Sequence, residues 1–331
     1  MRNNLPPNIR IGLALGSGSA RGMAHIGVIR ALQKYNLQPD IICGSSVGAL
    51  MGAAAAHGCL DKIATWLSEM STLDLVRYLD ISLLSGSGVA DGERLLQFLR
   101  AEFGDPNIED LALPFAAVAT ELQTGREVWL QQGSVWDAAR ASMALPGMLT
   151  PVLKDGRWLV DGGLVNPVPV SVCRALGADV IIAVNLNSDL VSRQFALHQN
   201  PSATDQPEDI TPAPVLTEGT ANNETQNLFA KLSVSIKERA SPLIEQWMSP
   251  SEETPGLFGV VASSINIMQD RITRSRLAGE PADIVLTPRL NDVGMLEFSR
   301  AKDVIKEGEQ CVARMHSLIE HRLGRSTQRD A

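Results

Sequence analysis

The chain has 331 residues, of which 44% are hydrophobic and 20% charged. These proportions are typical of globular proteins, so they exclude a disordered or collagen-like chain and supply enough apolar residues for a sizeable core. Acidic residues outnumber basic residues by 37 to 29, which gives a formal net charge of −8. That charge argues against a general affinity for nucleic acid, and we expect no nucleic-acid partner.

Neither the cysteines nor the first residues indicate a metal site or an export signal. The four cysteines are scattered, and none belongs to the Cys-x-x-Cys pair of a zinc or redox site. Residues 1–10 have no apolar segment of the signal-peptide kind, and no later run reaches roughly 18 apolar residues. We therefore predict a cytoplasmic protein without a metal or other cofactor. Peripheral contact with a membrane stays open, because an apolar patch built in three dimensions leaves no contiguous mark in a sequence.

The first 56 residues contain two copies of a strand, a tight turn and a helix. Residues 9–15 are an apolar run that ends in a glycine and serine cluster, and residues 23–35 carry apolar side chains at helical spacing. Residues 40–43 form a second apolar run, and residues 47–56 have the Ala-rich composition of a buried helix. Two such units in succession predict parallel strands joined by right-handed helical crossovers, which is the α/β pattern.

The α/β pattern continues towards the C-terminus. Apolar runs bounded by turn residues predict further strands at 115–122, 126–130, 158–160, 179–186 and 283–287. Helical spacing predicts helices at 170–176 and 296–323. We expect the last of these helices to pack on the domain, with binding of a partner as the alternative.

A change of composition interrupts this pattern. Residues 194–230 contain five acidic residues and no Lys or Arg, and seven of the 18 prolines lie between residues 201 and 255. Such a segment lacks the means to form a packed core, so we expect either a solvated surface insertion or a mobile cover over a site. The predicted organisation is a core at 9–187, a proline-rich acidic insertion at 188–255, and a C-terminal strand and helices at 256–323 packed on the core.

The sharpest local motif is a G-x-S-x-G formed by Gly44, Ser45, Ser46, Val47 and Gly48, between a predicted strand and a predicted helix. In that context a sharp turn exposes the central serine hydroxyl, and the glycines leave room for the turn. The N-terminus of the following helix also directs free N–H groups towards charge that develops beside the serine. Ser46 is therefore a candidate nucleophile, whereas Ser45 shapes the turn. A structural βα turn without chemistry is the alternative.

A second motif runs from Gly16 to Gly22 as Gly-Ser-Gly-Ser-Ala-Arg-Gly, again between a strand and a helix. A dinucleotide site needs G-x-G-x-x-G and an acidic residue that closes the second strand, but Gly22 comes one position late and Asp40 precedes that strand. A P-loop needs Gly-Lys-Ser/Thr, which this segment lacks. The interpretation that fits best is a flexible loop whose backbone N–H groups face an oxyanion.

An activated serine needs a base to take its proton. The histidines lie on predicted helices or beside the proline-rich segment, and none is well placed for this role: His25, His57, His198, His316 and His321. A carboxylate is better placed, because Asp161, Gly162 and Gly163 form an Asp-Gly-Gly at the end of an apolar run. By itself Asp-Gly-Gly is a common turn.

Together, the glycine-rich loop ending in Arg21-Gly22, the turn around Ser46 and the Asp-Gly-Gly at Asp161 resemble, in this order, the patatin-like phospholipase family. The resemblance covers residues 9–186, and bacterial members and the esterase domain of neuropathy target esterase are the most similar in appearance. It implies a three-layer α/β/α sandwich of patatin type with a mainly parallel central sheet. It also implies a Ser-Asp dyad in place of a triad, with Ser46 as nucleophile and Asp161 as base.

The family's glycine-rich loop aligns through its Arg-Gly, so the resemblance places Gly18 and Ser19 where the oxyanion N–H groups are expected. Ser17 and Ser19 stand at family glycines, and Gly16 stands where the family often has an acidic residue. A serine preserves the backbone donors there only if its φ stays negative. We expect Arg21 to support the loop structurally, with attraction of a lipid phosphate as the alternative.

The predicted activity is that of a serine esterase or lipase that hydrolyses acyl esters, with phospholipids among the candidate substrates. In the two-step mechanism, Asp161 takes the proton of Ser46 as the hydroxyl attacks the ester carbonyl. The N–H groups of Gly18, Ser19 and Val47 hold the oxyanion, and water then hydrolyses the acyl-enzyme. A low-turnover regulatory or scaffold protein with the same fold is the alternative, and the glycine spacing disfavours a nucleotide-binding domain.

Overall fold

The computed structural model describes residues 9–70, 91–188, 257–294 and 297–324. Its contacts divide the chain into two compact units, one formed by Met1–Arg193 with Asn266–Ala331 and the other by Gln194–Ile265. The first unit contains the sheet and the candidate site, and residues 257–265 are the only described residues of the second. Apart from residue 188, the predicted insertion at 188–255 lies outside the described residues.

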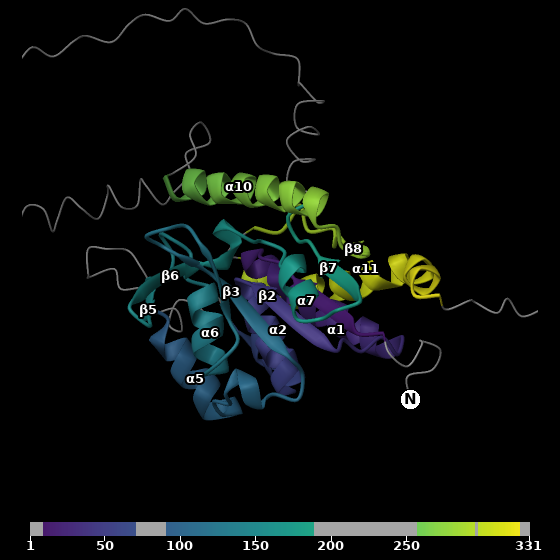
Figure 1. Ribbon diagram of the computed structural model, residues 1–331, viewed down its shortest axis with the longest axis horizontal. Coiled ribbons are helices and arrows are strands. Elements are labelled where there is room, and N and C mark those ends of the chain that lie inside the picture. Colours follow the sequence, from purple (N-terminus) through teal and green to yellow (C-terminus); the bar gives the residue numbers. More distant parts are fainter. Residues whose placement is uncertain (1–8, 71–90, 189–256, 295–296, 325–331) are drawn as a thin grey trace, which may run out of the picture. The chain divides into compact units, whose positions relative to one another are not determined.

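Within the described residues, eight strands form one sheet in the order β5-β6-β3-β2-β1-β7-β8, with β4 also paired to β3 (Figure 1). The strands are β1 (Ile11–Leu15), β2 (Ile41–Ser45), β3 (Phe115–Glu121), β4 (Glu127–Leu130), β5 (Val152–Lys154), β6 (Arg157–Asp161), β7 (Val180–Val184) and β8 (Ile284–Leu286). Strands β3, β2, β1, β7 and β8 are parallel to one another, whereas the β3–β4, β3–β6 and β5–β6 pairs are antiparallel. The prediction of a mainly parallel central sheet is confirmed.

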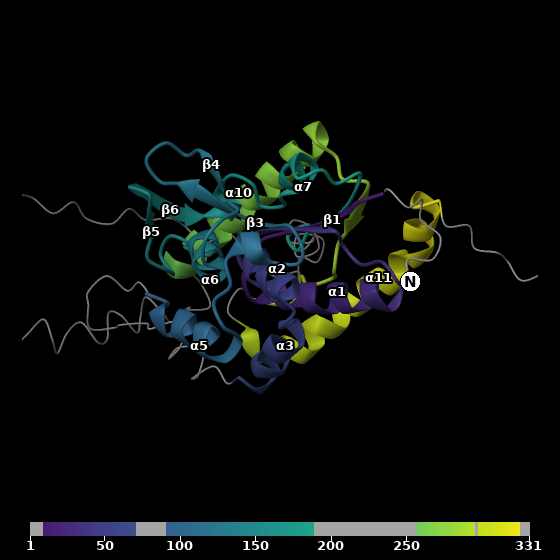
Figure 2. The same cartoon turned by 60° about the horizontal axis from the view of Figure 1, so that its bottom comes forward.

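Helices cover both faces of this sheet. The α-helices of the described residues are α1 (Ala24–Lys34), α2 (Val47–His57), α3 (Leu60–Glu69), α5 (Glu93–Phe103), α6 (Val135–Ser142), α7 (Val170–Ala175), α10 (Leu257–Gly279) and α11 (Ala301–Arg322). Figure 2 shows α7 on one side of the sheet and α1, α2, α3, α5 and α11 on the other. Strands β1 and β2 are buried along their whole length, as expected for parallel strands between two helical layers. The predicted three-layer α/β/α architecture is therefore confirmed.

Helix α11 packs directly against α1. A Cβ atom added to Gly27 on α1 would lie 1.8 Å from the carbonyl oxygen of Ile305, and one added to Gly308 on α11 would lie 2.1 Å from that of Ala24. The two backbones therefore approach at a distance that only glycine permits. Helix α11 closes the larger apolar core, which lies on the α1 and α2 side of the sheet. None of the described helices combines the length and the apolar character needed to cross a membrane.

Candidate active site

The turn around Ser46 has the strand-to-helix geometry that makes a G-x-S-x-G motif meaningful. Strand β2 ends at Ser45 and helix α2 begins at Val47, so Ser46 alone forms the turn, with a φ of +56°. This φ is one that a non-glycine residue adopts only under strain, and such strain occurs at functional turns of this type. A Cβ on Gly44 would lie 2.3 Å from the carbonyl oxygen of Gly48. The flanking glycines are therefore required by backbone contacts.

A buried serine on another helix holds this turn in place. The Ser46 N–H donates to the Oγ of Ser142 at 2.8 Å, and that hydroxyl donates to the carbonyl oxygen of Val118 on β3 at 2.5 Å. Ser142 ends helix α6, and its side chain is fully buried. It therefore links the strained turn to the sheet. Nothing in the sequence pattern indicated this role, because a single serine at the end of a short Ala-rich helix has no distinctive signal.

Asp161 lies beside Ser46, although the two residues are far apart in the sequence. Strand β6 ends at Asp161, which pairs with Ala119 of β3. The Ser46 hydroxyl donates to Oδ2 of Asp161 at 2.6 Å, and the Gly163 N–H donates to its Oδ1 at 2.7 Å. A Cβ on Gly162 would lie 2.1 Å from the Val118 carbonyl oxygen, so this part of the Asp-Gly-Gly also requires glycine.

The environment of Asp161 changes its acidity. The carboxyl group is fully buried, and burial raises its pKa to about 6 because the charged form loses its hydration. The hydrogen bonds from Ser46 and Gly163 lower the pKa and oppose part of that rise. A carboxyl group with a raised pKa is a stronger base when it is ionised. Asp161 lies within hydrogen-bonding distance of the Ser46 hydroxyl, which must lose its proton to act as a nucleophile.

The backbone N–H groups of the glycine-rich loop and of the turn after Ser46 differ in whether they have a partner. The Gly16 N–H donates to the Val184 carbonyl oxygen and the Ser17 N–H to that of Pro167. Among the described residues, the N–H groups of Gly18, Ser19 and Val47 have no hydrogen-bond partner. The loop also packs on the turn, since a Cβ on Gly22 would lie 2.2 Å from Cγ1 of Val47. Sequence reasoning predicts these three N–H groups as donors to an oxyanion, and this role stays a prediction.

The condition set for the serines of this loop is not met at Ser19, which has a φ of +51°. Its N–H nevertheless has no hydrogen-bond partner among the described residues. Ser17, in contrast, has no positive φ. Ser19 begins a short 3-10 helix (Ser19–Met23), and Gly18 before it lies outside the helical region of backbone angles.

Arg21 lies inside the loop structure. Its side chain is buried, its Nε donates to the Gly18 carbonyl oxygen at 3.3 Å, and its Nη2 donates to Oδ1 of Asn266 at 3.1 Å. Burial lowers the pKa of the guanidinium to about 10. These contacts with the loop favour the role of structural support over direct attraction of a lipid phosphate.

No histidine of the described residues contacts Ser46 or Asp161. The His25 Nε2 lies 2.7 Å from the Gly16 carbonyl oxygen, and complete burial lowers the pKa of this histidine to about 4, so it is neutral and supports the loop. The His57 ring lies 2.6 Å from the Phe103 carbonyl oxygen, and the His316 ring stacks on Tyr35. These three histidines therefore make their contacts away from Ser46 and Asp161. His198 lies outside the described residues.

Gln269 of α10 is a further residue that sequence reasoning missed. Its Oε1 accepts hydrogen bonds from the Ser17 hydroxyl and from Nδ2 of Asn187, both at 3.1 Å. A Cβ on Gly163 would lie 2.4 Å from its Nε2. One buried amide therefore contacts the glycine-rich loop, the end of β7 and the turn after Asp161. A lone glutamine on a helix gives no sequence signal for such a link.

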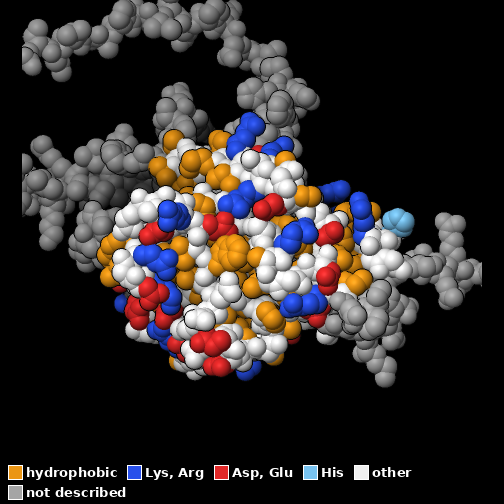
Figure 3. Space-filling view, viewed as in Figure 1, with side chains coloured by type: hydrophobic (Ala, Val, Ile, Leu, Met, Phe, Trp, Pro, Cys, Tyr) orange, Lys and Arg blue, Asp and Glu red, His pale blue; other side chains and the backbone are white. Residues whose placement is uncertain are grey.

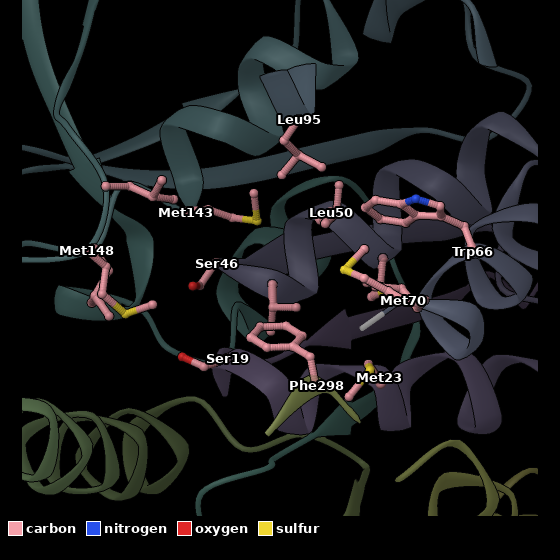
Figure 4. Close-up of a pocket in the computed structure, with 15 residues that line it drawn as sticks. Ser19, Met23, Ser46, Leu50, Trp66, Met70, Leu95, Met143, Met148 and Phe298 are labelled. Atoms are coloured by element: carbon pink, nitrogen blue, oxygen red, sulfur yellow. The ribbon is translucent and has the colours of Figure 1, made fainter. Parts of the chain in front are cut away.

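An apolar cavity opens beside Ser46. It has a volume of about 100 Å³, and its wall comes mainly from α2, α3, the start of α5 and the segment after α6. Figure 4 shows Ser46 and Ser19 between Met148 on one side and Phe298, Met70 and Trp66 on the other, with Trp66 at the far end. Apart from Ser46, Ser19 and the indole of Trp66, the described lining side chains are apolar. The cavity is suited to a hydrocarbon chain next to the serine.

The three-layer α/β/α fold, with a G-x-S-x-G turn after its second strand and a buried aspartate beside it, defines the patatin type of α/β protein. The family model described as "Patatin-like phospholipase" matches residues 13–174 of the chain. An uncharacterized NTE family protein of Mycobacterium tuberculosis is 37% identical over 321 residues, which is 90% of this chain and 89% of that protein. The chain belongs to the patatin-like phospholipase family, a family of lipid hydrolases.

Two further relatives are informative. The protein named lysophospholipase nte1 from Aspergillus fumigatus is 37% identical over 188 residues, covering 54% of this chain and 12% of that protein. Patatin-like phospholipase domain-containing protein 7 of Rattus norvegicus is 37% identical over 190 residues, covering 54% of this chain and 14% of that protein. The similarity to these two proteins is therefore confined to a small part of their length.

Proposed function

We propose that the protein is a serine hydrolase that cleaves acyl ester bonds of lipids through Ser46 and Asp161. The observation that carries the proposal is the 2.6 Å hydrogen bond from the Ser46 hydroxyl to a buried carboxylate, next to an apolar cavity. The family and the name of the Aspergillus relative favour a lipid ester, and a lysophospholipid in particular, as substrate. The direct assay is release of fatty acid from lysophosphatidylcholine and from p-nitrophenyl esters.

Acylation follows from the contacts of Ser46. As its oxygen attacks the ester carbonyl carbon, the hydroxyl proton passes to Oδ2 of Asp161, and the carbonyl π electrons move to the oxygen. The free N–H groups of Gly18, Ser19 and Val47 stabilise this oxyanion. When the intermediate collapses, the alcohol leaves with the proton held by Asp161, and the acyl group stays on Ser46.

Deacylation uses the same residues in the same order. Ionised Asp161 takes a proton from a water molecule that attacks the acyl carbon, and the same N–H groups stabilise the second oxyanion. Collapse returns the proton to Ser46 and releases the fatty acid. A carboxylate is a weak base towards serine in water, so the burial that raises the pKa of Asp161 to about 6 is central to both steps.

The apolar cavity predicts how the rate depends on acyl length. Burial of each methylene contributes about 0.8 kcal/mol, which is about a fourfold rise in kcat/KM for each added carbon while the cavity fills. We expect this rise along a p-nitrophenyl ester series that starts at acetate, followed by a plateau. Trp66 forms the wall opposite Ser46 (Figure 4), so Trp66→Ala should move the plateau to longer chains. A flat series, or an unchanged plateau in the variant, would exclude this cavity as the acyl site.

Contact with a membrane surface is part of the proposal and is supported by a row of exposed apolar side chains. Leu153 of β5 pairs with Trp158 of β6, and the Leu122 N–H donates to the Trp158 carbonyl oxygen, so the three residues lie across adjacent strands on one face. Their exposed fractions are 57%, 43% and 52% for Leu153, Trp158 and Leu122. Figure 3 shows one face of the molecule, on which apolar side chains lie among charged ones. Trp and Leu in such positions insert at the boundary of a lipid bilayer.

The membrane contact predicts a specific loss in a vesicle assay. We expect Leu153→Glu to reduce co-sedimentation with phosphatidylcholine vesicles by about tenfold, because a charge must be dehydrated to enter the interface. The matched control is Leu318→Glu on α11, where a leucine is 44% exposed. If both variants and the wild type bound the vesicles equally, the row formed by Leu122, Leu153 and Trp158 would not be the contact surface.

A further inference from the structure

The cavity beside Ser46 contains a second hydroxyl that the mechanism above does not use. Among the described residues that line this cavity, Ser19 and the indole of Trp66 are the only polar side chains besides Ser46. Figure 4 shows the hydroxyls of Ser19 and Ser46 side by side in the view, both directed towards the open space beside Met148, with Trp66 on the far side. A polar group beside Ser46 faces the ester group of a bound substrate, whereas the acyl chain of that substrate extends among apolar side chains.

The Ser19 hydroxyl is free to bind a substrate. It has no hydrogen-bond partner in the part of the chain that the structure describes. The neighbouring Ser17 differs, because its hydroxyl is held by Gln269 at 3.1 Å. The Ser19 side chain is half-buried at the cavity wall, so its hydroxyl loses part of its hydration when a ligand fills the cavity. A hydroxyl that is dehydrated by a ligand must then form a hydrogen bond to that ligand or weaken its binding.

The backbone of Ser19 points to the same conclusion. Its φ of +51° is a conformation that glycine adopts freely and that a residue with a Cβ adopts at a cost. Serine does not have the local tolerance of this region that Asn and Asp have. A side chain that is kept at such a position, and that faces a cavity instead of packing, is a reason to infer a function for the side chain.

We propose that the Ser19 hydroxyl donates a hydrogen bond to the carbonyl oxygen of the bound ester and stabilises the oxyanion, together with the backbone N–H groups. The inference rests on the proposed function of Ser46. When the bond from Ser46 Oγ to the carbonyl carbon forms, the π electrons move to the oxygen and the Ser46 proton moves to Asp161. The Ser19 proton stays on its own oxygen throughout, and its hydrogen bond strengthens as the negative charge grows.

Two variants separate this role from a structural one. Ser19→Gly removes the hydroxyl and also relieves the unfavourable φ, so it is expected to keep or raise the Tm. Ser19→Ala removes the hydroxyl but keeps the Cβ. For both variants we expect kcat to fall by about 10- to 100-fold with KM within about twofold of the wild type, because the bond strengthens only in the transition state.

A trifluoromethyl ketone with a short acyl chain gives an independent readout. Its adduct with Ser46 carries an oxyanion, so its affinity should fall by the same factor as kcat in both variants. Wild-type kcat in a folded Ser19→Gly protein would overturn the proposal, and so would a loss of kcat with unchanged ketone affinity. If the wild type itself has no turnover and does not bind the ketone, then the proposed function of Ser46 fails, which is a different result from either of these.

Discussion

Ser46→Ala is expected to lose ester hydrolysis by about 10⁴-fold or more, because Ser46 is the only described hydroxyl lining the cavity that donates a hydrogen bond to a base. Alanine can keep the backbone of the turn, since the Ser46 N–H and not its side chain is held by Ser142. The Tm should therefore stay close to that of the wild type. The measurement is kcat/KM for a short p-nitrophenyl ester, with the Tm measured on the same sample.

The control for this variant is Ser68→Ala. The Ser68 hydroxyl donates to the Ala64 carbonyl oxygen within helix α3, and Ser68 is not among the residues that line the cavity. Ser68→Ala removes the same chemical group as Ser46→Ala, a serine hydroxyl, and should keep wild-type turnover. If Ser46→Ala retained turnover in a folded protein, the serine would not be the nucleophile.

Asp161→Asn is expected to lower kcat by about 10² to 10⁴ through loss of the base. Asparagine has nearly the same shape and can still accept the Gly163 N–H, so the turn should persist. In the wild type, kcat/KM should fall about tenfold per pH unit below about pH 6, because only the ionised form of Asp161 accepts the proton. The residual activity of the variant should lack this acidic limb. A variant with wild-type turnover, or with the same acidic limb, would contradict the role of Asp161.

The same substitution is expected to change stability in the opposite direction to activity. The pKa of Asp161 in the folded protein, about 6, lies above its ordinary value of 3.8, so the folded state binds this proton more tightly than the unfolded chain. The free energy of unfolding therefore falls as the pH rises from about 4 to about 6, and the loss persists above pH 6. Because Asp161→Asn has no group to ionise there, its Tm should exceed that of the wild type at pH 8, and the difference should vanish near pH 4.

The central strands and the turn around Ser46 could be predicted because their signals are local. An apolar run followed by Gly-x-Ser-x-Gly and an Ala-rich segment indicated the order of strand, turn and helix. The strand itself ends two residues later than the predicted 40–43. Gly44 and Ser45 continue the ladder by pairing with Ala117 and Val118 of β3, and neither residue type is a strand former by itself.

Helices α3, α5 and α6 and strand β5 had no predicted counterpart. Helix α6 has only eight residues, which is shorter than the window over which a helical period is read. Helices α3 and α5 have no side-chain hydrogen bond at their N-termini, so the usual start signal is missing. Strand β5 has only three residues. These elements form because the sheet and the apolar core surround them.

The candidate site was predictable in its residues but not in its shape. Ser46 and Asp161 were paired through the family resemblance, because the separation between them in the sequence carries no contact information. The cavity could not be anticipated, since its wall combines side chains such as Leu50, Trp66 and Met148 from separate elements. The positive φ of Ser19 was also missed, because it follows from the path of the loop and not from its residue types.

The most direct test of the central claim is intact-mass spectrometry after incubation with a fluorophosphonate, on the wild type and on Ser46→Ala. Such a reagent reacts with a serine whose proton is taken by a neighbouring base. We expect the wild type to gain the mass of one phosphonyl group and Ser46→Ala to gain none. A folded wild type that gains no mass, or a Ser46→Ala variant labelled to the same extent, would contradict an activated nucleophile at Ser46.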